Sequence, residues 1–504
     1  MSEPLERLAE HAHESHVVVA GGGVSGLVAA LECAKVGIRV TVLEASDAFG
    51  GVVRSAEVGG LTLDVGAESF ATRGGIVRGL LSELGLADQV VAPNTAGAWV
   101  AGVPGVGAAP LPKGGVLGIP DNPWAPDVRR VIGWAGAWRA YVDRLRPPLT
   151  IGHQHSLGAL VRSRMGARVL DRLVAPVTSG VYSARPDDID VDLAAPGLNA
   201  ALTRTGSLSG TVAELRAARA TPAPADAPAS DVPATSPGPC SVPRTPAPGG
   251  AVEGIVGGMS RLVAALVGRL DELGAELRTG VSVEGLSRDG SGWVVGTEGD
   301  SLHADAVIVA LPERAARELL APVVPNPDPV DPIAPVVEVV TLVVDAPALD
   351  AAPRGTGVLT VPGSHIAKAL THSTAKWDWV RDATGPGTHV VRVSFGAQGE
   401  EPATADLDDD AAAALALSEA AALLGVALAP SALRASHRVR YVQSQPGAAI
   451  GRAAQTDAAR AAVRAVPGLA ATGAWLSGTG LAQVIPDARA EADRGRSAAL
   501  WRRD

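Results

Sequence analysis

The chain has few aromatic residues and few cysteines. Among its 504 residues there are three phenylalanines, three tyrosines and two cysteines, Cys33 and Cys240. With so few rings, a surface that holds nucleic acid by stacking against its bases is not expected. The two cysteines lie far apart and form neither a metal-ligand spacing nor a disulfide framework, which fits a reducing compartment.

Excess positive charge and long apolar segments are also missing. The formal net charge of −10 argues against polyanion binding by the bulk of the surface. No apolar run reaches the ~18 residues that a membrane-spanning helix requires. The polar segment 1–16 lacks the basic and then apolar order of a secretory signal. We therefore expect a cytoplasmic protein without a transmembrane segment or a nucleic-acid partner.

Alanine, valine and leucine supply most of the hydrophobic residues, which make up 47% of the chain. A chain of this length and composition can form two or three domains around large cores. The composition changes between 221 and 250, where nine of the 38 prolines lie among alanine, serine and threonine. Such a segment buries too little apolar surface to offset its ordering entropy, so we expect a disordered insertion over 217–252.

The hydrophobic pattern predicts a mixed α/β fold. A strand, a glycine turn, a helix and a second strand are expected at 16–20, 21–26, 25–36 and 39–43. This order is that of a parallel βαβ unit. Further strands are expected at 281–283, 292–297, 306–310, 336–344, 357–361 and 390–395. The region 128–175 is expected to be mainly helical, and the Gly- and Pro-rich segment 98–126 irregular.

Three glycines after the first strand, Gly21, Gly23 and Gly26, have the spacing G-x-G-x-x-G. The first permits a tight turn, the second lets a pyrophosphate approach the backbone, and the third lets the helix pack against the strand. The helix N-terminus then offers N–H groups to the phosphate charge. Glu44 ends the second strand, where a carboxylate accepts hydrogen bonds from ribose hydroxyls. The sequence therefore predicts a Rossmann-type dinucleotide site.

Two later glycine turns favour FAD as the dinucleotide. Gly50 and Gly51, followed by Arg54, come just after the ribose carboxylate, where an extended dinucleotide needs a second close approach of the backbone. Arg54 could neutralise the pyrophosphate or be a solvated surface residue. Near the other end of the chain, the turn 473–480 precedes a helix expected from about Gln483. Its N-terminus would face the flavin ring, where reduction develops negative charge.

Several motifs resemble those of the FAD-dependent porphyrinogen oxidases of haem synthesis, within the amine-oxidase-like flavoproteins. They are the segment 17–54, DVGAESF at 64–70, LPKGGVLGIP at 111–120, GGMSRL at 257–262, KW at 376–377 and the turn at 473–480. The first and last are shared with monoamine oxidases and carotenoid desaturases, whereas the LPKGGVLGIP, GGMSRL and KW motifs narrow the resemblance. Two features depart from the family: the Pro-rich insertion, and GTGLAQVIPD, where the family more often has Gly-Ile-Pro after the second glycine.

The resemblance implies an α/β fold, α+β overall, with a Rossmann-type FAD-binding domain, a mixed-sheet substrate domain and a helical domain lining the active site. The FAD-binding domain would comprise 1–94, 253–315 and 441–504, the helical domain 95–216, and the substrate domain 316–440. From the motifs and the resemblance together, the cofactor-binding candidates are Gly21, Gly22, Gly23, Val24, Ser25, Gly26, Glu44, Ala45, Gly50, Gly51, Val52, Arg54, Val283, Trp475, Gly480, Leu481 and Val484.

The implied activity is that of the bacterial branch, which oxidises coproporphyrinogen III to coproporphyrin III. Three hydride transfers to the flavin would remove the electrons, and molecular oxygen would reoxidise the flavin to give hydrogen peroxide. No metal-ligand cluster, carboxylate pair or protein nucleophile stands out, so the chemistry is expected to centre on the flavin. The propionates of the substrate need cationic partners. The candidates, each with a solvated surface role as the alternative, are Arg73, Lys113, Lys368 and Lys376.

Other functions remain open from the sequence. Protoporphyrinogen IX oxidase uses the same cofactor on a ring that carries two propionates rather than four. A flavin amine oxidase usually has an aromatic cage, for which this chain offers Trp475 and few other rings. A non-catalytic porphyrin-binding flavoprotein would keep the FAD motif. The Pro-rich insertion could contact a partner such as ferrochelatase, or be a tolerated linker.

Overall fold

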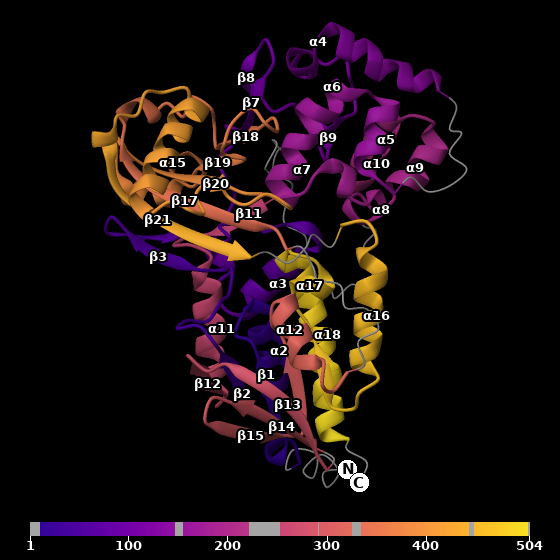
Figure 1. The fold of residues 1–504 in the computed structure, drawn as a ribbon, viewed down its shortest axis with the longest axis vertical. Helices are drawn as coiled ribbons and strands as arrows, with labels where there is room; N and C mark the ends of the chain where they lie inside the picture. The colour runs from indigo at the N-terminus through magenta and orange to yellow at the C-terminus, as the bar shows by residue number, and fades with distance from the viewer. Residues whose placement is uncertain are drawn as a thin grey trace, which may run out of the picture.

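A computed structural model of the chain describes residues 11–146, 155–220, 252–290, 292–324, 334–442 and 448–501. Figure 1 shows three parts: a lower part around a parallel sheet, an upper part with a large mixed sheet, and an upper helical part. The indigo, salmon and yellow segments of the lower part come from the beginning, middle and end of the chain. The lower part is therefore discontinuous in sequence.

The lower part is built on a five-stranded parallel sheet with the order β12-β2-β1-β16-β22. Its strands are β1 (His16–Ala20), β2 (Arg39–Glu44), β12 (Glu276–Thr279), β16 (Ala306–Val309) and β22 (Leu469–Ala471). The helices on one face are α2 (Val24–Ala34), α3 (Ile76–Glu83), α11 (Ser260–Glu272) and α18 (Leu481–Leu500). The other face carries a small antiparallel sheet, β13 (Val283–Asp289), β14 (Gly292–Thr297) and β15 (Asp300–Ala304).

Alternate residues of the central strand β1 enter two separate cores. Val17 and Val19 pack with the helices, whereas Val18 and Ala20 pack with the small sheet, where Trp293 is fully buried. A parallel strand that is covered on both faces reads as a continuous apolar run, as this one does. Side chains on a strand alternate between its faces, so this double burial fixes the register of β1 between its neighbours.

The second part contains a seven-stranded mixed sheet with the order β21-β17-β20-β19-β18-β7-β8. Its strands are β7 (Ala98–Val103), β8 (Gly107–Pro110), β17 (Val336–Asp345), β18 (Gly357–Thr360), β19 (Ala369–His372), β20 (Thr388–Phe395) and β21 (Leu433–Val442). Helix α15 (Asp409–Leu424) packs on this sheet, and the Asp408 side chain caps it by accepting a hydrogen bond from the Ala411 N–H at 2.8 Å.

The third part consists of short helices that pack around a core of their own. They are α4 (Pro126–Tyr141), α5 (Leu157–Arg164), α6 (Ala167–Val169), the π-helical turn η4 (Leu170–Val174), α7 (Ala175–Tyr182), α8 (Val191–Ala194), α9 (Leu198–Thr205) and α10 (Leu208–Ala220). The mainly helical character expected for 128–175 is thus confirmed in its described residues. Helix α7 packs against β18, and a Cβ on Gly180 would lie 2.6 Å from the Leu359 side chain. The helical part and the mixed sheet are therefore in close contact.

The remaining elements are short and lie within or between the three parts. They are β3 (Ser55–Val58), β4 (Leu61–Asp64), β5 (Phe70–Ala71), β6 (Val90–Val91), β9 (Gly115–Val116), β10 (Ile119–Pro120), β11 (Val252–Ile255), α12 (Glu313–Leu320), α13 (Ser373–Lys376), α14 (Asp378–Thr384), α16 (Arg452–Arg464), α17 (Ala474–Ser477) and the single-turn 3₁₀ helices η1 (Arg73–Gly75), η2 (Ala87–Gln89), η3 (Val142–Leu145), η5 (Pro186–Asp188), η6 (Pro347–Leu349) and η7 (Pro430–Ala432). Within the described ranges, no helix is both long and apolar enough to cross a membrane.

The mixed α/β fold expected from the sequence is confirmed, with two corrections. The segment 98–126, expected to be irregular, supplies β7 and β8, because β7 finds a parallel partner in the distant strand β18. The last helix begins at Leu481 rather than at about Gln483. The Pro-rich segment 221–250 lies outside the described residues.

Candidate functional site

The carboxyl ends of the parallel strands meet at one edge of the five-stranded sheet, which is where open α/β sheets bind ligands. At this edge the chain leaves β1 through the glycine turn and enters α2 at Val24, with Gly23 as the N-cap residue. No side chain caps this helix, so its first N–H groups are available to a ligand. The edge faces the junction with the two upper parts (Figure 1).

The three glycines of the motif meet three different steric demands. Gly21 has a φ of +108°, which side chains rarely tolerate. A Cβ on Gly26 would lie 1.9 Å from the Gly21 carbonyl oxygen, so the helix approaches the turn as closely as the backbone allows. A Cβ on Gly23 would meet no atom within 4 Å. The backbone of Gly23 therefore faces open space, as a pyrophosphate cradle requires.

The second glycine pair lies directly beside the first turn. Gly50 forms a parallel bridge with Gly23, and its N–H donates to the Gly22 carbonyl at 2.9 Å. A Cβ on Gly51 would lie 3.4 Å from the Gly23 Cα. The Ala67 N–H then donates to the Val52 carbonyl at 2.9 Å, which attaches the segment 64–70. Three motifs that are separate in the sequence thus form one continuous backbone surface.

Glu44 lies at the end of β2, on the rim of this surface. Its carboxylate accepts hydrogen bonds from the Gly22 N–H at 2.7 Å and the Ser46 N–H at 2.9 Å. Its carbonyl accepts from the Val281 N–H, which brings the start of β13 and the candidate Val283 to the same rim. A carboxylate in this place can also accept from ribose hydroxyls.

The C-terminal turn closes the site from the side of α18. A Cβ on Gly473 would lie 3.7 Å from both the Ser25 Oγ and the Trp475 Cδ1 atoms. The Ser25 Oγ and Trp475 Nε1 atoms are buried, and neither has a hydrogen-bond partner among the described residues. Buried polar atoms of this kind are expensive unless a bound group satisfies them. Gly480 caps α18, and Val484 is buried in its first turn.

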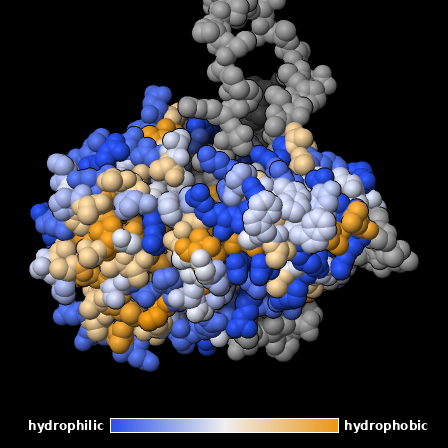
Figure 2. Space-filling view, turned by 90° about the horizontal axis from the view of Figure 1, so that it is seen from above, coloured by the Kyte–Doolittle hydropathy of each residue, from blue (hydrophilic) through white to orange (hydrophobic). Residues whose placement is uncertain are grey.

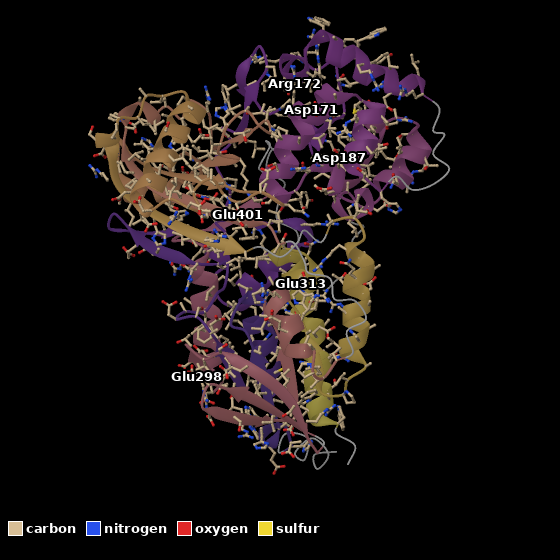
Figure 3. The ribbon with its side chains drawn as sticks, viewed as in Figure 1. Asp171, Arg172, Asp187, Glu298, Glu313 and Glu401 are labelled. Carbon is tan, nitrogen blue, oxygen red and sulfur yellow. The ribbon has the colours of Figure 1, made fainter. Side chains whose placement is uncertain are left out.

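A buried ion-pair network, which no pattern in the sequence indicates, holds Trp475 in place. Arg452 is 2% exposed and donates to Glu313 at 2.5 Å and to the Trp475 carbonyl at 3.2 Å. Arg317 also donates to Glu313, at 2.9 Å, and its guanidinium lies 5.3 Å from the centre of the Trp475 ring. Figure 3 shows Glu313 at the upper end of the lower part, facing the junction. No local pattern could link Glu313 with Arg452, which is far along the chain.

A second network joins the segment 64–70 to the mixed sheet. Lys376 and Arg392 donate to the two oxygens of Glu68, at 2.5 and 2.9 Å. Burial alone would raise the pKa of Glu68, but these two cations outweigh it and lower that pKa to about 2. Asp64 accepts from the Met259 N–H at the start of α11, and burial raises the pKa of Asp64 to about 6. Lys376, predicted as a substrate-binding residue, thus has a carboxylate partner of its own.

Two of the other basic candidates converge where the three parts meet, at the end of α7. Lys368 donates from Nζ to the Ser183 Oγ at 2.7 Å, and no carboxylate of the described residues pairs with it. Burial lowers the pKa of Lys368 to about 8. Arg73 lies in the lower part, near Tyr182. Burial raises the pKa of Tyr182, and the positive charge of Arg73 opposes this rise. Lys113 lies elsewhere, exposed, with its N–H bonded to Asp127.

Two remaining expectations concern Arg54 and metal ligands. Arg54 pairs with Asp47 at 2.7 Å beside the Glu44 rim. Among the described residues, no group of three or more His, Cys, Asp or Glu side chains is placed to hold a metal ion. The polar groups that do gather at the sheet edge are backbone N–H groups, Ser25, Glu44 and Trp475, which suit a dinucleotide.

The similarity to a known protein family identifies the dinucleotide that this edge binds. The family model of flavin-containing amine oxidoreductases matches residues 24–494. The chain belongs to this family. It is therefore an FAD-dependent oxidoreductase, and the open cradle at Gly23 with the unsatisfied Ser25 and Trp475 atoms fits that cofactor. The resemblance inferred from the motifs is confirmed.

Individual relatives of this flavin oxidoreductase match it over almost its whole length. A protein named coproporphyrinogen III oxidase from Propionibacterium freudenreichii is 31% identical over 97% of this chain and 92% of its own. A protein of the same name from Bacillus subtilis is 26% identical over 95% of this chain and 97% of its own. A crystal structure of a proposed protoporphyrinogen oxidase from Exiguobacterium has a TM-score of 0.78 at 22% identity, covering 96% of this chain and 98% of its own. A putrescine oxidase structure has a TM-score of 0.61 at 16% identity, covering 96% and 98%.

Replacing Gly26 with alanine tests the cradle of this flavin oxidoreductase. The new Cβ would collide with the Gly21 carbonyl, so we expect loss of bound FAD and destabilisation by about 1–3 kcal/mol. The readouts are flavin absorbance of the purified protein and the free energy of unfolding in urea. Gly79→Ala in α3 is the matched control, because a Cβ there meets nothing within 4 Å. Normal FAD content in Gly26→Ala would contradict the assignment.

Replacing Lys376 tests how much the Glu68 network contributes to the stability of the fold. Lys376→Met leaves Glu68 paired with one cation, Arg392, among the described residues, and we expect a loss of about 3 kcal/mol in the free energy of unfolding at neutral pH. The lowered pKa of Glu68 stabilises the fold above pH 4.5, and this stabilisation is lost as the pH falls towards about 2. Urea unfolding at neutral pH and at about pH 3 should therefore show a smaller acid-induced loss in Glu68→Gln than in the wild type. Equal losses would exclude this role.

Proposed function

We propose that the protein oxidises coproporphyrinogen III to coproporphyrin III, with molecular oxygen as electron acceptor and hydrogen peroxide as the second product. The observation that carries the proposal is the similarity, over 97% of the chain, to a protein named coproporphyrinogen III oxidase at 31% identity. Further relatives of that name, from mycobacteria, match 92% of the chain at the same identity. The similarity covers the mixed sheet and the helical part as well as the FAD-binding part, so it includes the surfaces that select the substrate.

FAD would lie along the carboxyl edge of the parallel sheet. Glu44 would accept the ribose hydroxyls, with Ala45 and Val283 at the adenine end. The pyrophosphate would meet the N-terminus of α2, with Gly50, Gly51, Val52 and Arg54 on its other side. The flavin end would face Trp475, Gly480, Leu481 and Val484. When bound, FAD supplies a hydride acceptor and an oxygen-reactive centre.

The chain's own residues would hold the substrate at the junction of the three parts. Ligand sites are common between domains, with a few polar groups among apolar walls. Lys368 and Arg73 approach the end of α7 from two different parts of the molecule, and Lys368 has no carboxylate partner among the described residues. A propionate would supply the missing negative charge. Lys376 is less suited, because Glu68 already neutralises it. Lys113, which is exposed as Arg73 also is, lies beside Asp127 instead.

Protoporphyrinogen IX is the competing substrate, because its oxidation uses the same cofactor on a ring that carries two propionates rather than four. We would supply both porphyrinogens to the purified flavoprotein, and follow porphyrin fluorescence in air and flavin bleaching without oxygen. Faster oxidation of coproporphyrinogen, with peroxide formed, supports the proposal. A preference for protoporphyrinogen would reassign the substrate. Failure to bleach the flavin with either porphyrinogen would overturn both assignments, and amines would be tested next.

The titration of Lys368 makes a sharper test of substrate binding. Because burial lowers its pKa to about 8, Lys368 loses its charge as the pH rises through 8, and the KM for coproporphyrinogen should rise with it. Lys368→Met should raise KM about tenfold or more at pH 7 and remove the pH dependence, with a smaller effect on kcat. Lys368→Arg should keep a low KM, because arginine stays charged across this range.

The matched control for this series is Lys35→Met. Lys35 follows directly after α2 and pairs with Glu32. Figure 1 shows α2 in the lower part and α7 in the upper helical part. The KM and pH profile of this variant should equal those of the wild type. If Lys368→Met also kept the wild-type KM, propionate binding by Lys368 would be excluded, while the oxidase assignment would stand on the flavin-bleaching result.

A further inference from the structure

Ser183, the residue that ends α7, has a backbone conformation that is unusual for a serine. Its φ is +51°, in the left-handed region that residues other than glycine rarely adopt. Such strain costs free energy and persists where the surrounding contacts hold it, often at functional sites. Ser183 is 3% exposed, so it forms no part of the outer surface of the upper parts, on which Figure 2 shows hydrophilic and hydrophobic side chains interspersed.

Two hydrogen bonds of Ser183 join the helical part to the mixed sheet. Its hydroxyl accepts from the Lys368 Nζ at 2.7 Å, and its carbonyl accepts from the Gln398 N–H at 2.8 Å. Lys368 directly precedes β19, and Gln398 follows β20, which is the antiparallel neighbour of β19. The Lys368 N–H donates to the Ser394 carbonyl near the end of β20 at 2.9 Å. Ser183 therefore holds Lys368 and Gln398 at the same end of the sheet.

The turn that carries Gln398 is fixed at both of its ends. It begins at Gly396, which has a φ of +82° and where a Cβ would collide with the Val336 carbonyl oxygen. Beyond Gln398, the Glu400 carboxylate pairs with Arg185 at 3.1 Å, just after the end of α7. The turn is therefore attached to the mixed sheet on one side and to the helical part on the other.

The side-chain oxygen of Gln398 is buried and has no hydrogen-bond partner among the described residues. A buried acceptor without a donor costs free energy, so an atom in this state calls for a partner. An amide oxygen accepts hydrogen bonds and cannot donate them. The Lys368 ammonium, at the same end of the sheet, can only donate, and no carboxylate of the described residues pairs with it. The two side chains together therefore suit a ligand that has both an anionic group and a hydrogen-bond donor.

A porphyrinogen has both groups. Its propionates are anionic acceptors, which suit Lys368 but cannot satisfy the Gln398 oxygen. Its pyrrole N–H groups are donors, which suit the Gln398 oxygen. We propose that Gln398 is a substrate-binding residue whose side-chain oxygen accepts a hydrogen bond from a pyrrole N–H, while Lys368 binds a propionate. This assignment rests on the porphyrinogen oxidation proposed above.

The hydrogen bond to Gln398 separates the substrate from the product. The carbon bridges of a porphyrinogen are saturated, so each pyrrole can tilt and present its N–H to a residue outside the ring. In the planar, oxidised porphyrin, the remaining N–H groups lie inside the macrocycle, which shields them. A site that bonds an N–H of one ligand loses affinity for a related ligand that cannot offer it. Gln398 therefore favours the porphyrinogen, whereas Lys368 binds the propionates of both.

Gln398→Met tests this selectivity, because methionine has a similar length and only a weak acceptor in its thioether sulfur. The KM of the intact flavoprotein, for whichever porphyrinogen the wild type oxidises faster, should rise about tenfold. The Kd of the corresponding porphyrin, measured by the quenching of its fluorescence, should stay within about twofold of the wild type. Lys368→Met should weaken the binding of both ligands by about tenfold. The FAD content of the purified Gln398→Met protein should equal that of the wild type, which shows that it folds.

Gln89→Met is the matched control. The side-chain oxygen of Gln89 is also buried without a partner among the described residues. Its backbone bonds Leu86 and Val256 rather than the end of α7. The KM and the Kd of Gln89→Met should therefore equal those of the wild type. A rise in its KM as large as that of Gln398→Met would overturn the proposal.

The remaining outcomes distinguish this proposal from the proposed function. A wild-type KM in Gln398→Met would overturn the role of Gln398 and leave the porphyrinogen oxidation intact. Equal losses of affinity for porphyrinogen and porphyrin would also overturn it, because they would show that Gln398 supports the site without bonding the pyrrole N–H. If the wild-type protein oxidised neither porphyrinogen, the proposed function would fail together with this inference, and the flavin-bleaching assay would show it before any variant is compared.

Discussion

The approach of α2 to the end of β1 is the constraint on which the remaining site depends. At Gly26 the helix lies so close to the Gly21 carbonyl that no Cβ fits between them. This proximity directs the free N–H groups of the helix to the carboxyl edge of the sheet. It also leaves the Gly23 backbone open, and Gly50 can then form its bridge with Gly23. The second glycine turn, and through Val52 the segment 64–70, are positioned by that bridge.

Because the parallel sheet collects strands from three distant segments, the site is complete only when the whole lower part has folded. Strand β16 brings Glu313 to the carboxyl edge, and β22 brings Trp475. Arg452 then connects the two at a position 2% exposed to solvent. Removing either partner would leave a buried charge, which is far more costly than the loss of an exposed pair. The position of the candidate residue Trp475 therefore depends on the folding of this network.

The sequence predicted those features that depend on neighbours along the chain. The strand 16–20, the glycine turn and the order of the βαβ unit follow from local spacing, and the structure has them. Strand β7 was not predicted, because its partner β18 lies far along the chain. The same holds for the pairing of Glu68 with Lys376. The sequence around Glu68 or Lys376 does not indicate this pairing, because an ion pair between distant segments forms only when the domains pack together.

Buried cations that have a carboxylate partner stabilise this molecule, whereas a buried cation without such a partner is suited to bind an anion. Arg452 and Lys376 are buried or nearly so, and each has a carboxylate within hydrogen-bond distance, so they stabilise the structure around the candidate site. Lys368 is also largely buried, and burial lowers its pKa, but its Nζ atom bonds only the Ser183 hydroxyl among the described residues. A protein maintains an unpaired buried cation at a cost in stability. That cost is understandable at Lys368 if the missing anion arrives with the substrate.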